Sequence, residues 1–154
     1  MNETSSEPVL KLNFLSHGTL IVENLERSRQ FFEEFLGLET VKTAKIALAV
    51  RVNSNTSVAC VQFGEVVHEL EREGKVYSHF GLDMGSAEEV LEAHRLALEH
   101  QDEYSIREVG DITETDSGPN FMIEDMDHNY WKFLSGEEGG YSSKFGPPGP
   151  LGIQ

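Results

Sequence analysis

The fold is decided by the stretch HGTLIVENLERSRQFFEEFLGLET, residues 17–40. An apolar, β-rich segment over 15–22 predicts a strand. Asn24 suits the N-cap of a helix, because apolar residues then recur at helical spacing up to Leu36. Gly37 can adopt the left-handed backbone that ends a helix, so the stretch predicts one strand followed by one helix.

The same pattern extends outward and then repeats. Short apolar runs predict strands over 38–41, 46–52 and 57–63, with a polar hairpin turn at 53–56. A second strand and helix follow, with Ser86 as N-cap and Glu89 at the capping-box position. This second pair and its strands are predicted over 77–83, 86–98, 105–109, 120–124 and 130–134.

The order β-α-β-β-β therefore occurs twice, and neither half can bury its sheet alone. We expect an α+β fold in which paired βαβββ modules form an open mixed-sheet barrel with a central cup. The single domain is predicted over 14–135, with module one at 14–63 and module two at 77–135. Polar residues 1–13 and glycine- and proline-rich residues 136–154 are expected to be tails.

The composition of the chain limits the kinds of partner that we expect it to bind. The chain has 154 residues and a net charge of −15, so its surface repels nucleic acid and anionic membranes. The single cysteine, Cys60, excludes an internal disulfide, and no signal peptide or membrane span is recognisable. We expect a cytoplasmic protein whose partner is a small molecule.

Three motifs resemble the vicinal oxygen chelate superfamily, which includes glyoxalases, bleomycin-resistance proteins and extradiol dioxygenases. Residues 17–39 are similar to its opening strand and helix, and Ser78–Asp83 to the strand with its second His. Glu124–Lys132 resembles its final hairpin, usually Asp-Pro-Asp-Gly-Asn-x-x-Glu. The likeness is greatest to single-domain proteins related to biphenyl-diol dioxygenases. A homodimer is among the assemblies that we expect.

In that family two His and the final Glu hold a divalent metal, a geometry that suits Fe²⁺. The resemblance places His17 and His79 at the His positions, but Lys132 at the Glu position. A protonated Lys has no lone pair and repels a dication. We therefore expect no cofactor, or a weakly held divalent metal, Fe²⁺ if any.

The positions where two-domain dioxygenases carry a catalytic Tyr and His correspond to Met122 and Thr113, which do no acid–base chemistry near neutral pH. Three functions remain open. The protein is a lyase, isomerase or dioxygenase-like enzyme with a degenerate metal site, a metal-free binding protein of the bleomycin-resistance type, or an active Fe(II) extradiol dioxygenase. Each acts on a small phenolic or oxygen-rich molecule.

The resemblance also suggests which residues line the cup. An inward Lys132 between His17 and His79 would hold a phenolate or carboxylate in place of the metal; its alternative is an exposed edge cation. The sequence offers no carboxylate at the neighbouring cup positions. Further ligand-binding candidates are Cys60, Tyr77, Met122 and Tyr130, and hairpin symmetry would set Cys60 opposite Lys132.

Several polar residues have plainer interpretations. Cys60 can equally be a small buried thiol of the core. Asp125 and Asp127 suit a turn rather than a metal site. We expect the remaining histidines at the surface or at the flanks of helices, namely His68, His94, His100 and His128.

Overall fold

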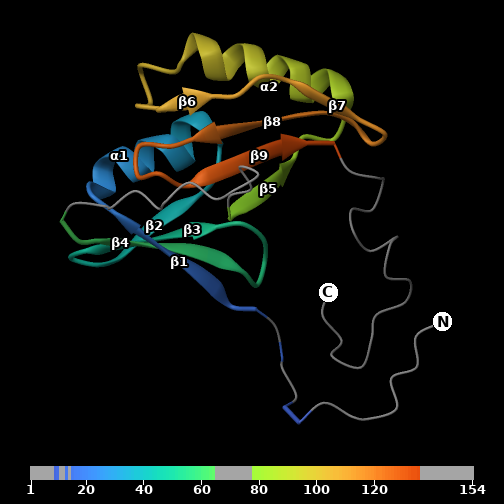
Figure 1. Ribbon diagram of the computed structural model, residues 1–154. Helices are drawn as coiled ribbons and strands as arrows, with labels where there is room; N and C mark the ends of the chain where they lie inside the picture. The colour runs from blue at the N-terminus through green and yellow to red at the C-terminus, as the bar shows by residue number, and fades with distance from the viewer. Residues whose placement is uncertain (1–8, 11–12, 14, 65–77, 136–154) are drawn as a thin grey trace.

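The computed structural model describes residues 9–10, 13, 15–64 and 78–135. One mixed sheet and its helices come first along the chain, and a second mixed sheet with its helix follows (Figure 1). Module one contains β1 (His17–Val22), α1 (Leu25–Gln30), the π-helix η1 (Phe31–Phe35), β2 (Thr40–Ala44), β3 (Ala47–Arg51) and β4 (Ser57–Gln62). Module two contains β5 (His79–Asp83), α2 (Ala87–Glu99), β6 (Glu108–Val109), β7 (Thr113–Thr115), β8 (Gly118–Glu124) and β9 (Tyr130–Leu134). No helix in the described ranges is long and apolar enough to cross a membrane.

The two modules repeat one topology, as the sequence predicted. Sheet A has the order β1-β4-β3-β2, and sheet B has the order β5-β9-β8-β6. In each sheet the first and last strands of the module pair in parallel, and the last two pair antiparallel. The sheets do not close into a barrel, so the expected α+β class with an open arrangement is confirmed. The sequence missed β7, a three-residue strand that pairs with β8.

The capping residues act as predicted. The Asn24 side chain accepts a hydrogen bond from the Arg27 amide at 3.0 Å, and the Ser86 side chain accepts one from Glu89 at 3.2 Å. Gly37 has a φ of +72°, the left-handed conformation expected after a helix. The first helix differs from the prediction in its second half, where Leu36 donates to the Phe31 carbonyl at 3.0 Å and closes a π-type turn.

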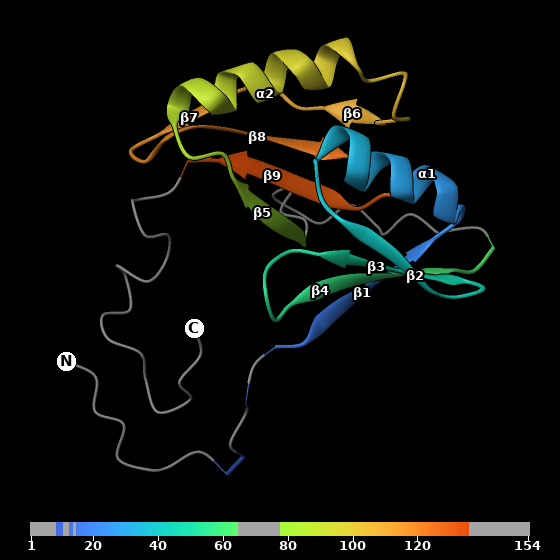
Figure 2. The same cartoon turned by 180° about the vertical axis from the view of Figure 1, so that it is seen from behind.

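Alternation along the strands divides each sheet into a buried and an open face. In sheet A the apolar face includes Val22, Val50 and Cys60; in sheet B it includes Phe121 and Phe133. The helix α2 covers sheet B on its outer side in both views, while α1 lies beside the junction of the sheets (Figures 1 and 2). Burying these faces supplies most of the folding free energy.

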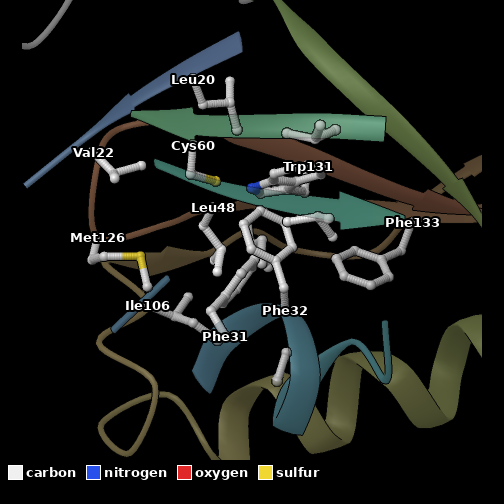
Figure 3. Packing of buried hydrophobic residues seen from close by; sticks show 14 of the residues in the cluster. Leu20, Val22, Phe31, Phe32, Leu48, Cys60, Ile106, Met126, Trp131 and Phe133 are labelled. Carbon is white, nitrogen blue, oxygen red and sulfur yellow. The ribbon is translucent and has the colours of Figure 1, made fainter. Parts of the chain in front are cut away.

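Trp131 joins the two modules in the core. Its ring lies 5.6 Å from Phe32 and 6.1 Å from Phe31 of module one, measured between centroids, and 5.4 Å from Phe80 of module two. Figure 3 shows the indole among the buried residues of both modules. Its Nε1 donates a 2.8 Å hydrogen bond to the Asp125 carboxylate, so the polar edge of the ring is satisfied in the core.

Asp125 also shapes the turn between β8 and β9. Its other carboxylate oxygen accepts from the amides of Asp127 and Asn129, at 2.8 and 2.9 Å. Burial raises the pKa of Asp125, whereas the hydrogen bonds from Trp131, Asn129 and Asp127 oppose that rise. Asp127 in turn accepts from the Glu23 amide at 3.0 Å, so the turn of module two is fastened to the end of β1. Both residues are turn residues, as expected.

The central position of Trp131 can be tested by Trp131→Phe. The change removes ring volume from the joint and leaves the buried Asp125 without one donor, so the free energy of unfolding should fall by about 2–4 kcal/mol. Denaturant unfolding followed by circular dichroism measures it. Phe63→Leu is the control, because Phe63 is 59% exposed and should change stability by less than about 0.5 kcal/mol. Equal stability of Trp131→Phe and the wild type would contradict this role.

Candidate ligand site at the junction of the modules

Four of the predicted site residues lie on the open face of sheet B, which is the face turned away from the core. In the register of the sheet, His79 pairs with Tyr130, and Lys132 is flanked by Gly81 and Met122. Directly paired side chains project to the same side of a sheet, and residues two apart on one strand do so too. The open face therefore carries His79, Met122, Tyr130 and Lys132, while Trp131 and Phe133 point into the core.

His17 lies at the start of β1, on the corresponding open face of sheet A. Its Nδ1 is 2.8 Å from the Ser16 hydroxyl, and the side chain is exposed. Its neighbour Gly18 lies against module two, since a Cβ there would sit 3.9 Å from the Phe80 ring. Phe80 in turn follows His79, so the strands that begin with the two histidines approach each other.

A cavity of about 430 Å³ lies where the modules approach. That volume falls in the range of small-molecule sites. Strand β1 contributes Thr19 and Ile21, which share the open face of His17. Module two contributes the first residues of β5 and the β8–β9 turn. The described residues that line the cavity are Thr19, Leu20, Ile21, Ser78, His79, Phe80, Asp127, His128, Asn129 and Tyr130.

Lys132 stands one pleat beyond this cavity. The next residue on its own face is Tyr130, which lines the cavity, about 6.6–7 Å along the strand. The residue is half-buried, and within the described part of the chain no ion pair or hydrogen bond to its ammonium group is found. Lys132 is thus a cation on the open face, beside a hollow that could hold the body of a small molecule.

The comparisons with known proteins fit this architecture. The sequence matches no protein-family model and no curated protein sequence. A mutant of the fosfomycin resistance protein FosX from Listeria monocytogenes, complexed with Mn(II) and dihydroxypropylphosphonic acid, has a TM-score of 0.63 at 18% identity, over 86% of this chain and 97% of that chain. FosX from Mesorhizobium loti has a TM-score of 0.59 at 20% identity, with the same coverages.

A glyoxalase/bleomycin resistance protein/dioxygenase from Alicyclobacillus acidocaldarius has a TM-score of 0.57 at 15% identity, over 79% of this chain and 89% of that chain. These proteins share the paired-module architecture. The chain has the vicinal oxygen chelate fold. At such identities the likeness concerns the fold, and the roles of individual residues have to come from this chain.

The metal of vicinal oxygen chelate proteins does not fit the residues present here. Lys132 supplies no lone pair where a carboxylate would bind the metal. Across residues 15–64 and 78–135 there is no group of three or more His, Cys, Asp or Glu side chains arranged to hold a metal ion. Weak binding of a divalent metal remains a prediction.

The prediction for Cys60 as a ligand-binding residue is wrong. Its side chain is fully buried and points toward Trp131 in the core (Figure 3). The hairpin symmetry was off by one residue. Because β1 starts its pairing at Ser57 and β5 starts at Tyr130, Ala59 is the counterpart of Lys132. The alternative, a small thiol of the core, is the correct one. Tyr77 lies outside the described residues.

The expected lack of carboxylates holds for the positions paired directly with Lys132, which are Gly81 and Met122. Two residues away in register, Asp83 pairs with Leu134 and Glu124 pairs with Tyr130. Neither forms an ion pair with Lys132 in the described structure: Asp83 accepts from the Gly85 amide, and Glu124 bonds His128 at 2.6 Å. Both carboxylates are therefore engaged by local hydrogen bonds. The order of residues along the strands does not reveal such bonds.

Of the remaining histidines that the structure describes, His128 departs from the expected surface or helix-flank positions, whereas His94 lies on α2. His94 is half-buried and packs edge-on against Phe121, with centroids 4.9 Å apart. His128 lines the cavity and has a φ of +65°. The sequence held a signal for His128, because it stands where the family pattern Asp-Pro-Asp-Gly-Asn has glycine. Of the other two, His100 bonds Glu103 at 2.9 Å on the surface, and His68 lies outside the described residues.

A second hollow lies on the helical side of the molecule. It measures about 530 Å³ and lies between the end of the first helix, α2 and the end of β5. Its walls are largely apolar, with carboxylates of Glu34, Asp83, Glu89 and Glu92 among the lining residues. None of the predicted site residues that the structure describes lines this hollow, and its carboxylates repel an anionic ligand, so the junction cavity is the better candidate.

The position of Cys60 predicts its reactivity. Burial, with smaller contributions from Asp125 and Asp127, raises the pKa of the thiol to about 12. Because the thiolate is the reactive form, Cys60 should react with a disulfide reagent only as fast as the protein unfolds. Stopped-flow labelling with and without denaturant measures this. Rapid labelling of the folded protein at neutral pH would place the thiol on an accessible face instead.

Proposed function

We propose that the protein binds a small, oxygen-rich organic anion at the junction of its modules, without requiring a metal. The observation that carries this proposal is Lys132. It is a half-buried cation on the open face of β9, with no described partner, in line with the cavity residues His79 and Tyr130. A cation partly removed from water is stabilised when an anion joins it.

The charges around Lys132 support an anionic group of limited size. Met122 and Gly81 flank the lysine on the open face and bring no charge of their own. The chain as a whole carries a net charge of −15, so an anion approaches against long-range repulsion and needs this local cation. A phenolate or a carboxylate satisfies the ammonium through a charge-assisted hydrogen bond.

A protein of similar fold also binds an anionic ligand together with a positive charge. In the complex of the Listeria FosX mutant, Mn(II) and a phosphonic acid are bound together. Here a fixed lysine would take over the neutralising charge that a metal supplies to an anionic ligand. Sequestration of the ligand needs nothing more than this site, and turnover would need acid–base groups, for which the imidazoles of His17 and His79 are the candidates.

The role of Lys132 in ligand binding can be tested with the variant Lys132→Met. The variant should bind benzoate and phenols more weakly by about 1.5–3 kcal/mol, the value of a charge-assisted hydrogen bond, and it should remain folded. Isothermal calorimetry gives the affinities and thermal unfolding checks the fold. Lys45→Met, which removes an exposed lysine from the β2–β3 turn, is the control. Equal affinities of Lys132→Met and the wild type would remove Lys132 from the site.

The metal prediction uses Lys132→Glu. Wild-type protein should bind Fe²⁺ or Mn²⁺ weakly, because its third ligand position holds a cation. Glu at that position completes the His-His-carboxylate set and should raise the affinity by at least about tenfold, or 1.4 kcal/mol. Metal titration followed by calorimetry measures both proteins. Stoichiometric iron in wild-type protein, lost in His17→Ala and His79→Ala, would contradict the metal-free proposal.

A further inference from the structure

The turn between β8 and β9 carries a histidine that the fold does not require. His128 has a φ of +65°, a conformation in which glycine is relaxed and a side chain is disfavoured. The turn is already closed by backbone bonds, because Asp125 donates to the Asn129 carbonyl at 2.9 Å and His128 to the Asp125 carbonyl at 3.2 Å. The imidazole therefore adds something other than turn geometry at this position.

The imidazole is held in one orientation by a buried carboxylate. Its Nδ1 lies 2.6 Å from Glu124 Oε2, and the two side chains are only 16% and 11% exposed. A His–carboxylate pair fixes the orientation and tautomer of the imidazole ring. Both residues come from module two and lie beside Tyr130, since Glu124 pairs with Tyr130 across the sheet.

His128 forms part of the wall of the junction cavity, as does His79 from the neighbouring strand. Among the described residues of the lining, Asp127 is the carboxylate, and neither lysine nor arginine is found. This end of the site is therefore suited to an uncharged group that shares a proton with imidazole, such as a hydroxyl, and not to an anion. The anionic end of a ligand would belong at Lys132.

The spacing of the two ends defines the ligand. Tyr130, in the cavity wall, and Lys132 are two residues apart on the same face, which is about 6.6–7 Å along a strand. We infer that the site takes a hydroxylated aromatic carboxylate, with its carboxylate at Lys132 and its hydroxyl in the cavity against His128, which Glu124 orients. A benzene ring with the two groups at opposite ends matches that one-pleat step from the cavity wall to the lysine.

This inference rests on the proposed function for the carboxylate end, whereas the hydroxyl end is new. The two can be separated by combining changes in the ligand with changes in the protein. The probes are 4-hydroxybenzoate, benzoate and phenol, with affinities measured by calorimetry. In wild-type protein the hydroxyl should make 4-hydroxybenzoate bind roughly tenfold more tightly than benzoate.

His128→Asn should abolish that difference, so that 4-hydroxybenzoate and benzoate bind alike. Asn tolerates positive φ, so the turn should remain intact, and thermal unfolding checks it. Lys132→Met should instead abolish the preference for 4-hydroxybenzoate over phenol. His100→Asn is the matched control, because His100 also bonds a glutamate, Glu103, but lies outside the cavity; it should leave all three affinities unchanged.

Glu124 is a positioning residue in this scheme. Glu124→Gln should shift the imidazole NMR signals of His128 and lower the hydroxyl preference, which a purely structural carboxylate would not do. A hydroxyl preference that survives in a folded His128→Asn protein would overturn the inference. If His128→Asn abolishes the hydroxyl preference but Lys132→Met changes no affinity, His128 contacts the hydroxyl and Lys132 does not hold the carboxylate. An effect of His100→Asn would move the ligand to the helical side and overturn both.

Discussion

The burial of Trp131 between the modules is the constraint on which the rest of the structure depends. A single indole contacts Phe31 and Phe32 from one module and Phe80 from the other, and its Nε1 is bonded to a buried aspartate. Once that ring is inward, the alternation of β9 requires that Tyr130 and Lys132 face outward. The site residues of module two thus follow from the packing of their neighbour.

The β8–β9 turn connects this packing to the cavity. Asp125 binds the indole and two turn amides, while Asp127 binds the Glu23 amide at the end of β1. The same short segment therefore stabilises the core, fixes the approach of β1 to module two and places His128 in the cavity wall. A change in the turn should therefore affect the site, because all of these bonds are made by residues of one short turn.

Much of the architecture could be predicted because it depends on local signals. Apolar periodicity gave the strands and helices, Asn24 and Ser86 marked where helices begin, and Gly37 marked an end. Such features need only neighbours along the chain.

The errors arose where non-local geometry decides. Cys60 was misplaced because the pairing register of β1 with β4 is not encoded within the hairpin. The cavity position of His128 depends on a backbone conformation and on a partner four residues away, Glu124. The π-type turn at Phe31–Phe35 has helical spacing like any α-helix, so periodicity could not distinguish it.

The central claim is that a small anion binds where the open face of sheet B meets β1. Backbone NMR during titration with benzoate tests it most directly, because every amide reports separately. Shifts should concentrate at Thr19, His79, Gly81, Tyr130 and Lys132, and they should saturate together. Shifts confined to the hollow between the first helix and α2, or no saturable shifts at millimolar benzoate, would contradict the account.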